Sequence, residues 1–229
     1  MITHTIEEKT MATQANGGVP AVPDDPYTAF GEANAVGDTF LKFDRGVYRF
    51  GPADASEVLP LGTLLVVNMP EMKVGWLKWQ DGEVAATDMR RLADGFYVTP
   101  REELGDMDEA LWEMGNDDLP KDPWTLTTLL PLKDPATGAE YVFTTSSKGG
   151  RAACGKLAIR YGEQRGLPAN AGKLPVIKID DGTYKHRKLQ QVIHFPVFRL
   201  VEWRSEAELV GNVAMPAAVG VDPSDEVPF

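Results

Sequence analysis

The feature that most constrains the fold is a series of short apolar segments separated by turn residues. Residues 73–80 and 83–86 flank Asp81-Gly82, a dipeptide that strongly favours a two-residue hairpin turn. A second hairpin is expected from residues 124–132 and 139–145, because turn-forming residues fill positions 134–138. Further strand-like segments, with Asp181-Gly182 expected as another turn, lie at residues 39–50, 61–67, 174–179 and 191–203.

One segment has a clear helix signal. It covers residues 152–164, and Gly166 and Pro168 end it. A shorter surface helix is expected at residues 109–114, between Asp108 and Gly115. Several short strands with one inserted helix predict a mainly β (α+β) fold. The natural candidate is a small oligonucleotide-binding (OB)-like barrel, which has about five strands and often a helix between the third and fourth.

Composition divides the chain into one domain and two tails. Residues 1–36 contain few large apolar side chains and several Gly and Pro residues, so we expect a flexible N-terminal arm. Residues 37–204 are expected to form a single β-rich OB-like nucleic-acid-binding domain, with an acidic insertion at residues 93–122. Residues 205–229 contain no aromatic side chain before Phe229 and predict a disordered acidic tail with an interaction tip.

Charge is segregated along the chain. The net charge of −11 by itself argues against a nucleic-acid partner. However, residues 1–36 carry −4, residues 205–229 carry −5 and residues 93–122 carry −8, whereas residues 123–204 carry +7. The basic part is therefore contiguous and available to a polyanion.

The basic part also contains aromatic residues, which is the combination that single strands require. Cations follow the phosphates, and bases stack on aromatic faces. Residues 183–188 supply Tyr184 and three permanent cations, although a solvated hairpin tip is the plain alternative. Trp76 and Trp79 are expected on opposite sides of one strand, and each singly favours a core position. The candidate DNA-binding residues are Lys148, Arg151, Lys156, Arg160, Tyr184, Lys185, His186, Arg187, Lys188, Trp76 and Trp79.

The C-terminal tip carries the most specific signal. Residues 224–229 resemble the acidic tip of bacterial single-stranded-DNA-binding proteins, with Val227 where that family usually has isoleucine and with a shorter acidic run. Residues 174–203 are similar to phage and prophage single-stranded-DNA-binding proteins. The resemblance implies sequence-independent DNA binding in replication, recombination or repair, in the cytoplasm of a phage-infected or prophage-carrying bacterium. It also implies recruitment of replication or repair proteins through Asp225, Glu226, Val227, Pro228 and Phe229.

Other functions receive less support. Residues 150–156 fit seven positions of a phosphate-binding loop, but Leu157 replaces the hydroxyl residue that holds magnesium, so a nucleotide hydrolase is disfavoured. His4, His186 and His194 have no metal-ligand spacing, and His194 is expected in the core. Cys154 is expected to be a small buried residue. We therefore expect a protein that is not an enzyme and has no metal or cofactor.

Two further points concern partners. The longest apolar stretch, residues 59–69, is about half the ~20 residues needed to cross a bilayer, so no membrane partner is expected. A homodimer is compatible with the sequence. The main alternative to a DNA-binding protein is a protein-interaction or virion-associated module that ignores DNA.

Overall fold

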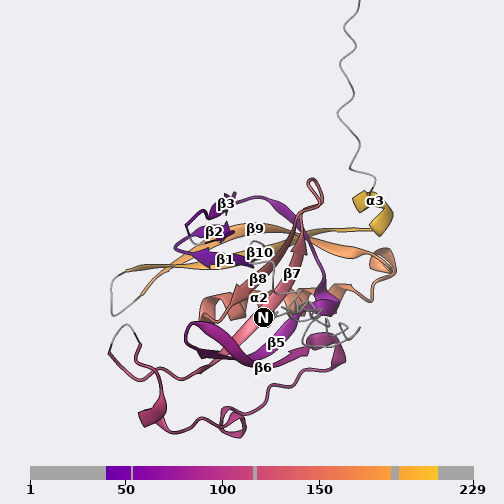
Figure 1. Cartoon of the computed structure of the whole chain (residues 1–229). Coiled ribbons are helices and arrows are strands. Elements are labelled where there is room, and N and C mark those ends of the chain that lie inside the picture. Colours follow the sequence, from indigo (N-terminus) through magenta and orange to yellow (C-terminus); the bar gives the residue numbers. More distant parts are fainter. Residues whose placement is uncertain (1–39, 53, 116–117, 187–190, 211–229) are drawn as a thin grey trace, which may run out of the picture. The chain divides into compact units, whose positions relative to one another are not determined.

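The computed structural model describes residues 40–52, 54–115, 118–186 and 191–210 (Figure 1). The predicted N-terminal arm and the C-terminal tip from Asp225 to Phe229 lie outside these residues. Two of the candidate DNA-binding residues, Arg187 and Lys188, lie outside them as well. Most of the predicted domain at residues 37–204 lies inside them.

Strands dominate the described residues, so the prediction of a mainly β structure is confirmed. The strands are β1 (Phe40–Asp44), β2 (Val47–Phe50), β3 (Glu57–Leu59), β4 (Leu64–Val67), β5 (Lys73–Gln80), β6 (Glu83–Arg91), β7 (Trp124–Lys133), β8 (Glu140–Thr145), β9 (Leu174–Lys185) and β10 (Val192–Arg204). Helix α2 (Lys148–Gln164) stands between β8 and β9, where the sequence predicts a helix, and the short helix α3 (Glu206–Val210) follows β10. Short 3-10 turns occupy connections: Met69–Glu71, Leu92–Asp94, Arg101–Leu104, Glu109–Leu111 and Pro168–Asn170.

The strands pair in one sheet in the order β10-β9-β4-β7-β8-β1-β2-β3, and β5 pairs with both β7 and β6. β1 runs parallel to β8, with Phe40 opposite Val142, whereas the other pairs are antiparallel. Among the described residues, β10 and β3 each pair with one strand only. Hydrogen bonds between these strands therefore do not close the sheet into a barrel.

Two of the predicted hairpins form at the expected turns. Asp81 and Gly82 join β5 to β6 with φ angles of 53° and 82°, the positive values that a two-residue hairpin turn requires. Between β7 and β8, the carboxylate of Asp134 accepts hydrogen bonds from the backbone N–H groups of Ala136 and Thr137. Local side-chain chemistry thus determines both turns.

The turn predicted at Asp181-Gly182 is wrong. β9 continues through both residues to Lys185, and Gly182 stands opposite Phe195 of β10. A Cβ atom at Gly182 would overlap the ring of Phe195. The glycine is therefore required for close packing of an aromatic ring against the backbone, and the pairing of β9 with β10 extends past it to Lys185 and Val192.

The core contains side chains from strands that lie far apart in the order of the sheet. Phe143 of β8 packs edge-on against Phe198 of β10, with ring centroids 5.1 Å apart. The buried Tyr48 of β2 lies between the same elements and donates a hydrogen bond to the backbone oxygen of Asp180 in β9 at 3.0 Å. The β1–β2 hairpin is consequently anchored against β9 and β10.

Candidate nucleic-acid interface

The N-terminal end of α2 is packed tightly against two strands. The hydroxyl of Ser147 caps the helix by accepting a hydrogen bond from the N–H of Gly150 at 3.0 Å. A Cβ atom at Gly150 would overlap the side chain of Thr145, and one at Gly149 would lie 3.1 Å from Cβ of Phe195. The segment that fits a phosphate-binding loop in sequence is therefore largely helical here, and its first glycine serves helix packing.

The β9–β10 hairpin presents an aromatic surface beside this end of α2. The side chain of Tyr184 is 52% exposed, and its ring centroid lies 6.2 Å from that of Phe195. The backbone of Gly149, one residue after Lys148, also comes close to Phe195, since a Cβ atom there would lie 3.1 Å from Cβ of Phe195. The fold thus brings Tyr184 and the first turn of α2 to the same phenylalanine.

The cations of α2 are divided between two sides of the helix. Lys156 and Arg160 follow Arg151 by five and nine positions, which at about 100° per residue rotates them about 140° and 180° away from it. Lys148 and Arg151 line one groove beside the helix. Lys156 and Arg160 do not line this groove, and a channel shared by all four cations stays a prediction.

Several cations outside the candidate set are ion-paired, whereas five candidate cations form no ion pair within the described residues. Lys78, Arg91, Arg101 and Lys133 each have a nitrogen within 3.0 Å of a carboxylate oxygen. By contrast, none of the carboxylates in the described residues forms an ion pair with any of the candidate cations Lys148, Arg151, Lys156, Arg160 and Lys185. The positive charge of this part of the surface is available to an external anion.

The two tryptophans of β5 both lie outside the core cluster. Trp76 is half-buried, and its indole N–H donates to the backbone oxygen of Thr99 at 2.8 Å. Trp79 is 37% exposed and lines a second pocket, about 610 Å³ in volume, together with Trp112. The core position favoured for each of them is wrong, because the segment after β6 covers Trp76 and leaves part of Trp79 uncovered.

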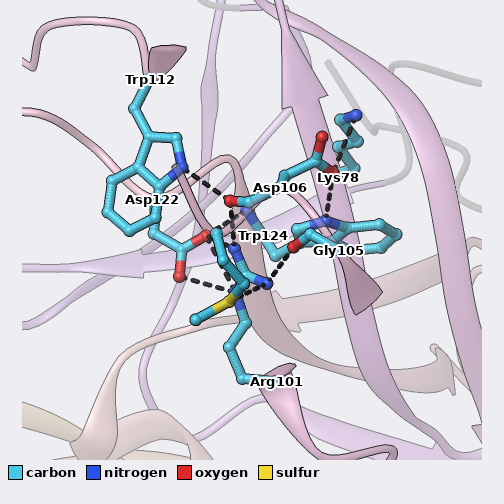
Figure 2. A network of polar contacts seen from close by, with 8 residues as sticks. Lys78, Arg101, Gly105, Asp106, Trp112, Asp122 and Trp124 are labelled. Carbon is cyan, nitrogen blue, oxygen red and sulfur yellow. Dashed lines mark hydrogen bonds and ion pairs between the residues drawn. The ribbon is translucent and has the colours of Figure 1, made fainter. Parts of the chain in front are cut away.

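Arg101 holds parts of the acidic insertion together, and Asp106 joins the insertion to the sheet, as Figure 2 shows. Arg101 donates to both carboxylate oxygens of Asp122, at 2.7 and 2.8 Å, and to the backbone oxygens of Gly105 and Asp106. The carboxylate of Asp106 accepts from Lys78 of β5 and from the indole of Trp124 of β7, each at 2.9 Å. Part of this acidic segment is therefore neutralised internally.

This network changes the predicted character of the insertion. The helix expected at residues 109–114 is only the 3-10 turn Glu109–Leu111, where the Asp108 carboxylate accepts a hydrogen bond from the N–H of Ala110. The hydrogen bonds from Lys78 and Trp124 lower the pKa of Asp106. Partial burial acts to raise the pKa of Asp122, but its hydrogen bonds with Arg101 and the Trp124 N–H lower it overall.

An apolar groove of about 750 Å³ was not anticipated from the sequence. We call it the α2 groove; it lies between α2, strands β5 and β7, and residues 92–98. Its walls include Val74, Leu92, Phe96, Leu126, Ala158 and Ile159, and Lys148 and Arg151 also line it. Four separate segments contribute to the groove, so no local sequence pattern marks it. Phe96 and Ile159 are apolar in the sequence, but only the structure shows that their side chains are exposed.

Three remaining candidates have clear environments. Cys154 is fully buried, as predicted, and burial raises the pKa of its thiol to about 12. His194 is not a core residue, because its Nδ1 lies 2.7 Å from Oδ2 of Asp181 and its side chain is 34% exposed. His186 is half-buried, and its backbone N–H donates to Gln191 at the end of the hairpin.

The described residues include no helix that is both long and apolar enough to span a membrane. They also include no group of three or more His, Cys, Asp or Glu side chains placed to hold a metal ion. Comparison of the chain with protein-family models, curated proteins and solved structures gave no match. Any functional conclusion must therefore come from the residues and their geometry.

Proposed function

We propose that this chain is a cytoplasmic, non-enzymatic protein that binds single-stranded DNA without sequence preference in replication, recombination or repair. The observation that carries the proposal is the neighbourhood of Phe195. There the exposed ring of Tyr184 lies beside the N-terminal end of α2, where Lys148 has no ion-pair partner among the described carboxylates. An exposed ring offers a stacking face for a base, and an unpaired cation attracts the adjacent phosphate.

Strand order supports an OB-like interpretation of the domain. If β1–β3 and β6 are set aside as additions and β4 with β5 is taken as the first strand, the strands that follow are β7 and β8, then α2, then β9 and β10. The helix thus lies between the third and fourth strands, as in many OB folds, and the β9–β10 hairpin corresponds to a loop that such barrels use for oligonucleotides. The contact of Phe143 with Phe198 is consistent with a partly open barrel.

The C-terminal tip completes the proposal. An acidic segment ending in Val227-Pro228-Phe229 combines an apolar end, a terminal carboxylate and preceding acids. This chemistry suits an apolar pocket with a basic rim on a replication or repair protein. In this proposal the hairpin side of the domain holds DNA, and the tip recruits the partner.

A fluorescence polarisation titration with labelled oligo-dT at two salt concentrations tests DNA binding. We expect binding that weakens as salt rises and that exceeds binding to a duplex of the same length. Absence of binding at low salt would contradict the proposal and would favour the protein-interaction alternative, which the exposed Leu111 and Met107 beside the second pocket support.

Two substitutions with matched controls test the site itself. Tyr184→Ala should lower affinity roughly five- to hundredfold, because one stacked base contributes about 1–3 kcal/mol, whereas Tyr184→Phe should retain most of it. Lys148→Ala should weaken binding and reduce its salt dependence. Lys133→Ala is the control, since Lys133 is already paired with Glu140 at 2.9 Å. Equal losses for Lys133→Ala and Lys148→Ala would show that net charge alone matters.

A further inference from the structure

The α2 groove combines an apolar interior with a charged margin. One wall is the sheet, where Val74 of β5 and Leu126 of β7 contribute side chains, and the opposite wall is α2 with Ala158 and Ile159. Phe96 lines the groove from the segment after β6, and 77% of its side chain is exposed. The volume of the α2 groove, about 750 Å³, falls within the range of about 300–1,000 Å³ that is usual for small-molecule sites.

The charged margin is positive and unsatisfied. Lys148 and Arg151 line the groove, and no described carboxylate pairs with either. The Nε atom of Arg151 is also buried without a hydrogen-bond partner among the described residues. A buried donor of this kind normally has a partner, because a buried donor without a hydrogen bond costs about 1–3 kcal/mol or more. The groove therefore calls for an occupant that has both apolar faces and acceptor oxygens.

We propose that the α2 groove is a second subsite for single-stranded DNA, in which unstacked bases enter the apolar interior and Lys148 and Arg151 contact the flanking phosphates. This inference rests on the proposed function. Lys148 lines the groove and directly precedes Gly149, whose backbone comes close to Phe195, the ring beside Tyr184. A strand stacked on Tyr184 can therefore continue into the groove, where Phe96 offers the next aromatic face.

The occupant is identified by charge as well as by shape. A purely apolar peptide would fill the interior but would leave the two cations unpaired. A single strand supplies bases for the interior and a phosphate for each cation, since its charge repeats with every nucleotide. The two unpaired cations therefore favour nucleic acid over a purely apolar partner.

Gly155 provides a direct test, because it lines the groove and a Cβ atom placed there has no neighbour within 4 Å. Gly155→Leu in the full chain should fill the groove without straining the helix. Gly162→Leu is the matched control, since Gly162 is exposed on the same helix, is equally uncrowded and does not line the groove. We expect Gly155→Leu to weaken oligo-dT binding about fivefold or more, and Gly162→Leu to leave it unchanged.

An abasic oligonucleotide of the same length separates bases from phosphates. We expect it to bind Gly155→Leu and the unsubstituted protein equally, because it has nothing to place in the groove. If Gly155→Leu binds oligo-dT as tightly as the unsubstituted protein does, the groove is not a DNA subsite, although the Tyr184 site stands. A change in sedimentation behaviour without a change in DNA affinity would instead assign the groove to a second copy and overturn the inference. Failure of the unsubstituted protein to bind DNA overturns the proposed function itself.

Discussion

The glycines of α2 illustrate how differently one residue type acts within a single helix. Gly149 and Gly150 permit the helix to approach Phe195 and Thr145, whereas Gly155 and Gly162 have open space around them. Glycine in a helix interior otherwise lowers stability by about 0.8–1.0 kcal/mol relative to alanine. The first pair is therefore required by packing, and the second pair has no structural requirement for glycine.

This difference predicts opposite effects of the same substitution. Gly150→Ala should lower the free energy of unfolding by about 1–3 kcal/mol, because the added methyl group overlaps Thr145. Gly162→Ala should raise it by about 0.5–1 kcal/mol through helix propensity. Urea denaturation followed by circular dichroism measures both. A stabilising Gly150→Ala would show that α2 does not pack against Thr145 as described.

A few contacts hold the acidic insertion against the sheet. Arg101 joins Asp122, which precedes β7, to the backbone at Gly105 and Asp106, and Lys78 and Trp124 attach Asp106 to the sheet. Hydrogen bonds with charged groups contribute about 1.5–3 kcal/mol each when buried, and less when partly exposed. Arg101→Ala should therefore reduce the free energy of unfolding by about 1–2 kcal/mol.

The same contacts predict a pH dependence. Lys78 and Arg101 hold the pKa values of Asp106 and Asp122 below their usual value of 3.8, so the folded protein binds fewer protons near pH 4 than the unfolded chain does. The stability they contribute is complete above the unfolded pKa and is lost as pH falls through the lowered folded values. We expect the insertion to detach at a pH below about 4, which the fluorescence of Trp112 and Trp124 reports.

Arg101→Ala separates this effect from general acid denaturation. In that variant the pKa of Asp122 loses its main lowering contact, so the fluorescence change should begin at a higher pH. An identical pH profile in both proteins would contradict a role for Arg101 in holding the insertion.

At the level of elements, sequence predicted what local chemistry determines. Asp81-Gly82 forms its hairpin because the turn needs only its own two residues, and α2 follows its expected course up to Gln164. Asp181-Gly182 has the same letters but lies inside β9, because the ring of Phe195 occupies the space above Gly182. Such a contact between distant residues leaves no local pattern.

The candidate site, too, was only partly predictable from the sequence. Tyr184, Lys148 and Arg151 were predicted from the basic and aromatic composition, but the absence of Lys156 from the α2 groove depends on which side of the helix is packed, and this is not evident in sequence. The α2 groove escaped prediction because its walls come from segments more than 80 positions apart, such as Val74 and Ile159.

For the whole molecule, the distribution of charge matters more than its sum. The five cations of the candidate interface form no ion pairs with the described carboxylates, whereas Arg101 and Lys78 neutralise part of the acidic insertion. Further negative charge comes from residues 1–36, with a net charge of −4, and from residues 211–229 of the C-terminal tail, which contain three acids and no base. Electrostatic competition between this tail and DNA should therefore be measurable.

Deleting residues 211–229 should tighten oligo-dT binding at low salt, because the tail no longer competes for the cations. The truncation leaves α3 intact, including the hydrogen bonds between Ser205 and Glu208. The gain should disappear at high salt, where exposed charges are screened, and capture of a replication or repair protein should be lost. Unchanged DNA affinity at low salt would count against competition by the tail.

The anchoring of Tyr48 against β9 also has a consequence for biosynthesis. Its hydroxyl bonds Asp180, 132 positions later, and β1 pairs with β8 about 100 positions later. At translation rates of about 5–20 residues per second, the first hairpin emerges from the ribosome roughly 7 to 26 seconds before Asp180 does. During that interval its apolar side chains have no permanent partner, so nascent chains stalled before β9 should be sensitive to proteases and dependent on chaperones.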